Sequence, residues 1–249
     1  MADRKIAVVG MAPSSAKMAA ELPRPEYEVW ALNTGYLFLG DAWDRWYEVH
    51  RYDWLLNRPG LHQQKYFEWL ATDHGRPVYV PQLDERIKNA AQYPFLDVVQ
   101  RFGRRLPDGK PVIYFQSTVD WMLAHAIYEY QVHTEQLGER PDWELHVLGV
   151  DMALGDEYAH QRPSCEYWLG IAQGMGITIA VPDRADIQKI RYVYGIDSYE
   201  PVAAKLGARR EELEAQLQNA ARAEAHARDK KMMVRGALEA QNWLEQQRY

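Results

Sequence analysis

The 249-residue sequence has little of what would cross-link a chain or hold it in a membrane. Its single cysteine, Cys165, excludes an intrachain disulfide and any metal cluster built on several cysteines, and fits a reducing compartment. It has no run of eighteen apolar residues and no apolar leader segment, so we expect a soluble, cytoplasmic protein without a membrane partner. A formal net charge of −6 does not indicate a general nucleic-acid-binding protein, since such proteins carry an excess of basic residues.

The sequence also lacks the common catalytic motifs. It has no HExxH zinc motif, no GxSxG nucleophile motif and no paired metal-ligand spacing. It also has no DxD-type motif in an expected loop, so we expect no metal site, with Asp151 as the open alternative. What it does have is 47% hydrophobic residues, nine Trp and sixteen Tyr. That supply is ample for a core, and amphipathic rings often line binding clefts.

Short apolar runs alternate with segments of helical spacing over most of the chain. Strands are expected at 5–9, 28–32, 43–49, 77–80, 145–150 and 177–181, and helices at 16–22, 61–73, 116–130 and 164–173. This alternation predicts an α/β fold with a Rossmann-like, mostly parallel sheet and helices on both faces.

The last forty residues differ in composition. Residues 209–247 are rich in Ala, Glu, Gln and Arg, with no proline and one glycine, Gly236. This composition predicts one long helix or a helical hairpin, with apolar positions too sparse for a sustained heptad. We therefore expect a nucleotide-binding catalytic domain over 1–200 and a helical appendage over 201–249, used for packing or for homo-oligomerisation.

The stretch 5–15, KIAVVGMAPSS, is the most informative part of the sequence. A β-branched run, a small-residue turn and an Ala-rich segment predict a strand, a loop and a helix. Backbone N–H groups at such a turn point toward one place and favour the binding of a nucleotide phosphate there. Gly10 leaves room for it, and Ser14 or Ser15 can cap the helix and donate to a phosphate oxygen. The turn is neither GxGxxG nor a Walker loop, so a plain connection is the alternative.

Polar residues follow several other expected strands, where ligands bind in parallel sheets. They are Asn33, His50–Asp53, Gln116–Thr118 and Asp151. Each has a structural alternative. Asn33 suits a turn, Ser117 can cap the N-terminus of a helix, and Asp151 can stabilise the loop after its strand. A lone histidine such as His50 is more often structural than catalytic.

The densest polar cluster is EYAHQRP at 157–163, in an expected loop. His160 can act as a general base near neutral pH, and Arg162 offers a planar fork to phosphate or carboxylate. An ordered surface loop is the alternative.

Taken in order over residues 5–182, these pieces resemble the bacterial lipo-oligosaccharide sialyltransferases, with the related pterin pyrophosphokinase-like proteins sharing the Rossmann-type core. The family's Gly-x-Gly-Pro-Ser turn corresponds to Gly10–Ser14, its nucleotide-contacting Asn to Asn33, and its Gly-Ile-Asp strand end to Gly149–Asp151. Ala12 replaces the second Gly, the lid is shorter, and residues 131–143 form an insertion. The segments WALNTGY, DRWYEVH and EYAHQRPSCEYWLG also resemble uncharacterised bacteriophage-encoded proteins.

The resemblance implies a nucleotide-dependent transferase, most specifically a glycosyltransferase with a CMP- or UDP-linked sugar donor and no metal. Gly10, Pro13 and Ser14 would hold the phosphates, and Asn33, Ser117, Thr118 and Asp151 the nucleotide. His160 would deprotonate an acceptor hydroxyl, for which a modified nucleotide or DNA is one candidate. Tyr158 and Arg162 would stabilise the departing phosphate.

Two alternatives stay open. One is a pyrophosphokinase-like enzyme with Mg²⁺ on Asp151 and Asp53. The other is a non-catalytic nucleotide-binding or virion assembly protein that uses the C-terminal helix as its interface.

Overall fold

The computed structural model describes residues 3–56, 61–152, 156–183, 185–189, 193–196 and 201–247. Within these ranges the chain divides into two compact units, Met1–Lys189 and Ile190–Tyr249. The division lies near the predicted boundary at residue 200, and the independence of the two parts stays a prediction.

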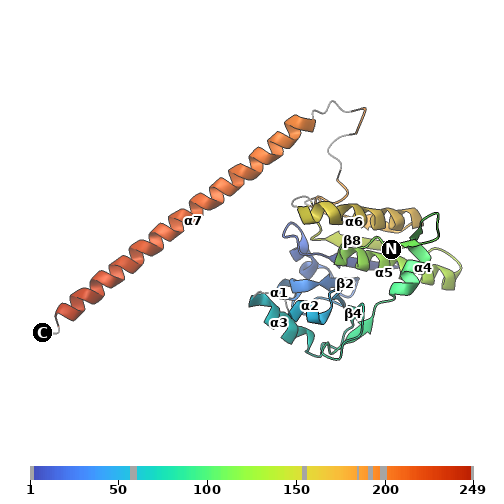
Figure 1. Cartoon of the computed structure of the whole chain (residues 1–249), viewed down its shortest axis with the longest axis horizontal. Coiled ribbons are helices and arrows are strands. Elements are labelled where there is room, and N and C mark those ends of the chain that lie inside the picture. The colour runs from blue at the N-terminus through green and yellow to red at the C-terminus, as the bar shows by residue number, and fades with distance from the viewer. Residues whose placement is uncertain are drawn as a thin grey trace. The chain divides into compact units, whose positions relative to one another are not determined.

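The first unit is built on a seven-stranded parallel sheet of order β5-β4-β3-β2-β1-β8-β9 (Figure 1). The apolar runs read from the sequence supply its longer strands. The strands are β1 (Arg4–Val9), β2 (Tyr27–Leu32), β3 (Arg45–Tyr47), β4 (Val78–Val80), β5 (Ala90–Gln92), β8 (Trp143–Leu148) and β9 (Thr178–Ala180). The predicted α/β fold with a parallel sheet is confirmed.

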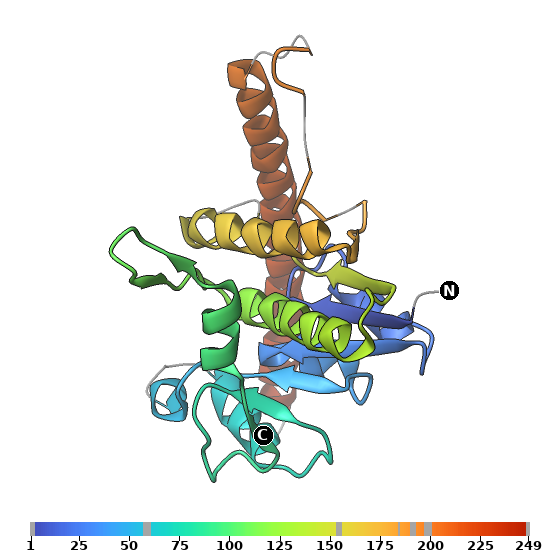
Figure 2. The same ribbon diagram turned by 90° about the vertical axis from the view of Figure 1, so that its right-hand side faces the viewer.

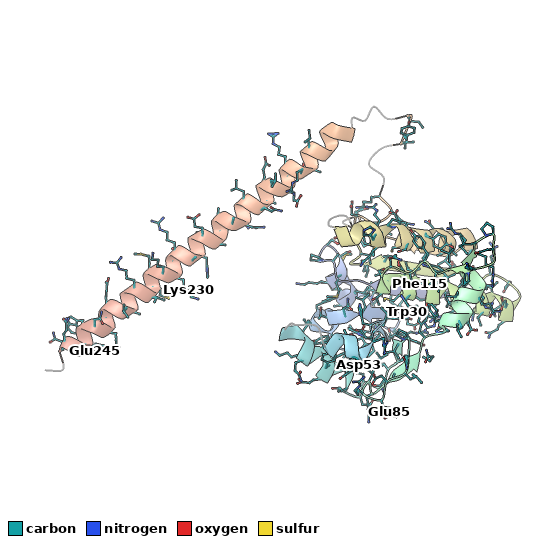
Figure 3. All side chains as sticks on the ribbon, viewed as in Figure 1. Trp30, Asp53, Glu85, Phe115, Lys230 and Glu245 are labelled. Atoms are coloured by element: carbon teal, nitrogen blue, oxygen red, sulfur yellow. The ribbon has the colours of Figure 1, made fainter. Side chains whose placement is uncertain are left out.

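Alternating side chains along the strands build one core on each face of the sheet. Ile6 and Val8 of β1 pack with residues of α5 (Thr118–Leu137) and α6 (Asp156–Met175). Ala7 and Val9 pack on the opposite face with residues of α1 (Tyr36–Leu39) and α3 (Leu61–Leu70). Figure 2 shows α5 and α6 running side by side, and Trp30, labelled in Figure 3, lies in the α5–α6 core.

The remaining elements are short. They are η1 (Ala16–Glu21), η2 (Asn33–Gly35), α2 (Tyr52–Leu56), α4 (Phe95–Phe102) and the hairpin of β6 (Arg104–Arg105) and β7 (Pro111–Val112). No pattern in the sequence predicted β5, α4 or the hairpin.

Two expectations are wrong. The segment after β1 is a six-residue 3-10 helix, η1, and is too short to present a helix dipole to a ligand. Residues 157–163 are helical turns of α6 and not a loop, and the helix accommodates Pro163.

The second unit contains one long helix, α7 (Pro201–Gln246). Its described apolar side chains are exposed, among them Leu213 at 48% and Met233 at 75%. Lys230 and Glu245, labelled in Figure 3, project from it. No helix in the described ranges is both long and apolar enough to cross a membrane.

Candidate ligand-binding site

The strand order reverses direction at one place, between β1 and β8. From β1 the chain builds outward through β2 to β5, and β8 and β9 are then added on the other side of β1. The loops that leave β1 and β8 therefore diverge over opposite faces of the sheet. In open parallel sheets a crevice forms at this point, outside the carboxyl ends of the strands.

The two loops touch through a pair of glycines. The Gly10 amide donates to Leu148 O at 2.8 Å, and the Ala12 amide donates to Gly149 O at 2.8 Å. A Cβ on Gly10 would overlap the Gly149 carbonyl oxygen and lie 2.9 Å from Val150 Cγ2. Gly149 has a φ of +65°, which favours glycine. The structure thus explains Gly10 by its contact with the loop after β8, whereas the sequence suggested room for a phosphate.

Hydroxyl groups link the same two loops. Ser14 Oγ donates to Asp151 Oδ1 at 2.7 Å, and Ser15 Oγ accepts from the Gly149 amide at 2.8 Å. Neither serine caps η1 through its side chain, so the predicted capping role is wrong. The single proton of the Ser14 hydroxyl is committed to Asp151, which leaves its oxygen only as an acceptor.

A cavity of about 810 Å³ opens above these loops. Its volume lies within the range of small-molecule and cofactor sites. It spans the carboxyl ends of β1, β2, β3 and β8 and the start of α5. Six of the predicted site residues line it: Gly10, Pro13, Asn33, Ser117, Thr118 and Asp151. The rest of the wall includes Met11, Ala12, Leu32, Val49, His50, Phe115, Gln116, Val119, Trp121, Gly149, Val150, Met152 and Gln161.

Two lining residues have backbone conformations that are uncommon for side chains larger than glycine. Asn33, directly after β2, has a φ of 49°, and Met152, after β8, has a φ of 50°. Among non-glycine residues, asparagine adopts a positive φ more readily than most, whereas methionine rarely adopts it. Backbone outliers of this kind cluster at ligand sites.

The start of α5 is fixed by a capping box. Ser117 Oγ accepts from the Asp120 amide at 3.3 Å, and Asp120 Oδ2 accepts from the amides of Gln116 and Ser117 at 2.7 and 2.9 Å. Ser164 Oγ of α6 donates to the same carboxylate at 2.7 Å. Burial raises the pKa of Asp120, and these hydrogen bonds oppose that rise. Capping, the alternative considered for Ser117, is therefore its role in the structure.

A buried carboxylate holds His50 at the end of the cavity nearest β3. Glu48 is 1% exposed, and its Oε1 accepts from the His50 amide at 2.8 Å and lies 2.8 Å from His50 Nδ1. Its Oε2 accepts from Tyr66 OH at 2.7 Å, and Tyr66 OH accepts from Trp46 Nε1 at 3.0 Å. Glu48 was not among the residues predicted from the sequence. The available signal was a Glu two residues before a His at a strand end.

The cluster at 157–163 is arranged differently from the prediction. His160 is exposed on α6 and is not among the described residues of the cavity wall, whereas its neighbour Gln161 is. Arg162 pairs with Glu166 at 2.9 Å and with Asp186 at 3.4 Å, and it too is not a described wall residue. Tyr158 lies on α6, and its side chain is outside the described part of the structure. The predicted roles of these three residues stay predictions.

The proposed metal ligands are not brought together in the described part of the chain. Asp151 lines the cavity, whereas Asp53 of α2 pairs with Arg86 at 3.0 Å and is not a described wall residue. The described residues contain no group of three or more His, Cys, Asp or Glu side chains arranged to hold a metal ion.

No family model and no curated protein matches the chain. Several solved structures of sialyltransferase CstII are similar to it. The Campylobacter jejuni enzyme in complex with cytidine-5'-monophosphate is 12% identical with a TM-score of 0.39, over 84% of this chain and 98% of that one. The same enzyme in complex with CMP-3FNeuAc is 13% identical with a TM-score of 0.38, and the match covers 82% of this chain and 99% of that one.

A third structure holds a trisaccharide acceptor and CMP, and it is 13% identical with a TM-score of 0.39, over 79% of this chain and 93% of that one. At this identity and TM-score the likeness does not establish a family. The comparisons do not support the links to pterin pyrophosphokinases or bacteriophage proteins.

Proposed function

We propose that this chain is a nucleotide-dependent transferase, and more specifically a glycosyltransferase that moves a sugar from a CMP- or UDP-linked donor to a hydroxyl acceptor. The observation that carries the proposal is the cavity at the β1–β8 reversal, because it combines the position at which parallel sheets bind nucleotides with a volume that suits one. Nearly all of the residues predicted to bind the donor line this cavity.

In this proposal the donor lies across the ends of β1 and β8. Of the Gly10–Pro13 loop, the Met11 amide is the donor offered to the phosphates, because the Gly10 and Ala12 amides already donate to the loop after β8 and Pro13 has no N–H. The Asn33 amide and Thr118 hydroxyl bind the nucleoside. Asp151, whose Oδ1 already accepts from Ser14, accepts from ribose hydroxyls through its carboxylate. The aromatic rings of Phe115 and Trp121 offer the wall against which a base can stack.

The predicted catalytic roles of His160, Tyr158 and Arg162 belong to the proposal only as candidates for test. Arg162 would have to leave Glu166 and Asp186 to reach a phosphate. The acceptor is defined here only as a hydroxyl compound. A modified nucleotide or DNA acceptor stays a prediction from the sequence.

A thermal-shift screen with CMP-, UDP- and GDP-linked sugars tests the proposal. A ligand that binds only the folded state at 100 times its Kd adds about 2.7 kcal/mol to the free energy of unfolding. We expect stabilisation by CMP- or UDP-linked ligands that is equal with Mg²⁺ and with EDTA. Stabilisation only with Mg²⁺ would favour the pyrophosphokinase-like alternative, and no stabilisation by any nucleotide would contradict the proposal.

A further inference from the structure

We infer that His50 is the general base of the proposed transfer and that Glu48 is the positioning residue that sets its tautomer. The inference rests on the proposed function and names a catalytic group that differs from His160. It is carried by the geometry of one end of the cavity, where a buried carboxylate contacts a histidine of the cavity wall.

The hydrogen bonds determine which atoms of this pair carry protons. The His50 amide can only donate, so Glu48 Oε1 accepts from it. Tyr66 OH accepts from Trp46 Nε1 and gives its own proton to Glu48 Oε2. Because both Glu48 oxygens act as acceptors, the 2.8 Å contact to His50 Nδ1 is assigned as a donation from Nδ1–H. Nε2 is then the ring nitrogen of His50 that can accept a proton.

Burial makes this arrangement stiff. Glu48 is 1% exposed, and Tyr66 on α3, which is itself held by the Trp46 indole on β3, donates to it. His50 has a side chain that is 35% exposed and lies on the cavity wall. A fixed carboxylate behind an accessible imidazole orients the ring and stabilises the imidazolium that forms when the base takes a proton.

The position of His50 suits an acceptor and not the donor phosphates. The sheet order places β2 and β1 between β3, which precedes His50, and β8, which precedes Asp151. In the transfer step, His50 Nε2 takes the proton of the acceptor hydroxyl, and the acceptor oxygen forms a bond to the anomeric carbon. The bond from that carbon to the donor phosphate oxygen breaks, and the nucleotide leaves with the electron pair. The imidazolium then releases its proton to water.

The test compares His50→Ala, His160→Ala and Glu48→Gln in the full chain, using CMP- and UDP-linked sugars. Binding is measured by calorimetry, and nucleotide release is measured with water or an added sugar as the acceptor. We expect His50→Ala to lower kcat by about 10²–10⁴-fold with the donor Kd unchanged. We expect Glu48→Gln to lower kcat at least about tenfold with KM unchanged, because the chain loses the charge that stabilises the imidazolium.

A spectroscopic readout separates positioning from general stability. Two-bond ¹H–¹⁵N correlation spectra should show neutral His50 as the Nδ1–H tautomer. In Glu48→Gln the neutral amide oxygen is a weaker acceptor than a carboxylate, so the preference for Nδ1–H should fall and the Nε2–H form should appear beside it. Glu144→Gln is the matched control, because Glu144 contacts His146 Nε2 at 2.9 Å with the same two-residue spacing, and neither is a described wall residue. It should change neither His50 nor turnover.

The outcomes discriminate between the two claims. Wild-type turnover in His50→Ala, or a larger loss in His160→Ala, would overturn the inference and leave the proposed function intact. A wild-type protein that binds no donor would overturn the proposed function and the inference together. If Glu48→Gln does not fold, His50→Ala still decides the base, since its partly exposed side chain can be removed without opening the core.

Discussion

Ser14 Oγ donates a 2.7 Å hydrogen bond to Asp151 Oδ1 and so joins the loop after β1 to the loop after β8, 137 residues later in the chain. The bond crosses the reversal of strand order, beside the wall of the cavity. It uses the hydroxyl proton that the sequence analysis reserved for a phosphate. The loop therefore depends on Asp151 for its shape as well as on its own residues.

We predict that Ser14 and Asp151 are coupled energetically. Ser14→Ala and Asp151→Ala should each reduce the free energy of unfolding by about 1 kcal/mol, because each removes the same hydrogen bond. The double variant should lose clearly less than the two single losses added together. Urea denaturation of the four proteins measures this, and strict additivity would show that the bond contributes nothing.

A second prediction concerns Gly10. Gly10→Ala should destabilise the fold by roughly 2 kcal/mol or more, because its Cβ would overlap the Gly149 carbonyl oxygen, a backbone atom that cannot move aside cheaply. Gly170→Ala on α6 is the control, since no heavy atom lies within 4 Å of its added Cβ. It should be neutral or stabilising by up to about 1 kcal/mol. Equal stability of the two variants would refute the close-contact explanation.

The third prediction is a pH dependence from His125. Burial lowers the pKa of His125 from 6.5 to about 4, against the opposing effect of Glu129. The folded state therefore holds the ring neutral, and the unfolded chain binds more protons below about pH 6.5. The stabilisation that neutral His125 contributes to the folded state is fully present above about pH 6.5 and is lost as the pH falls toward 4. Between about pH 7 and pH 5 the loss should be roughly 2 kcal/mol.

Chemical denaturation at several pH values checks this. His125→Gln should flatten the dependence above about pH 5. His226→Gln, on the exposed surface of α7, should leave it unchanged. An unchanged pH slope in His125→Gln would assign the acid sensitivity to other groups.

The fourth prediction is that residues 201–249 can be removed without unfolding the first unit. The described apolar side chains of α7 are exposed, so deletion should leave the α/β circular dichroism spectrum of the first unit and its thermal transition nearly unchanged. If α7 mediates homo-oligomerisation, light scattering should show a larger particle for the full chain than for the truncated protein. Loss of soluble protein on truncation would show that α7 completes a core.

Local patterns in the sequence led to the sheet but not to the contacts between its loops. The apolar runs of β1 and β8 and the helical spacing of α5 are local features, and the structure confirms them. The contact of Gly10 with Gly149 joins parts of the chain that are far apart, and no local pattern contains it. The same holds for Glu48, whose importance depends on Tyr66 from α3.

The clearest error has a physical reason too. Polar residues and Pro163 made 157–163 resemble a loop, since proline in a helix interior is costly. In the structure this segment is the first half of α6, with Pro163 exposed, while Ser164, Cys165 and Trp168 are buried in the following turns. A polar stretch of helix was therefore mistaken for a loop.

If a nucleotide binds in the cavity at the β1–β8 reversal, removing the Asn33 side chain should weaken its binding, which calorimetric titration of CMP and UDP into Asn33→Gly measures. Glycine keeps the φ of 49° and removes only the side-chain amide. Gln188→Gly is the matched control, because Gln188 has a φ of 58° and is not a described residue of the cavity wall. We expect wild-type affinity in Gln188→Gly and an affinity at least about tenfold weaker in Asn33→Gly, a loss of about 1.4 kcal/mol. Equal nucleotide affinity in all three proteins would contradict nucleotide binding in this cavity.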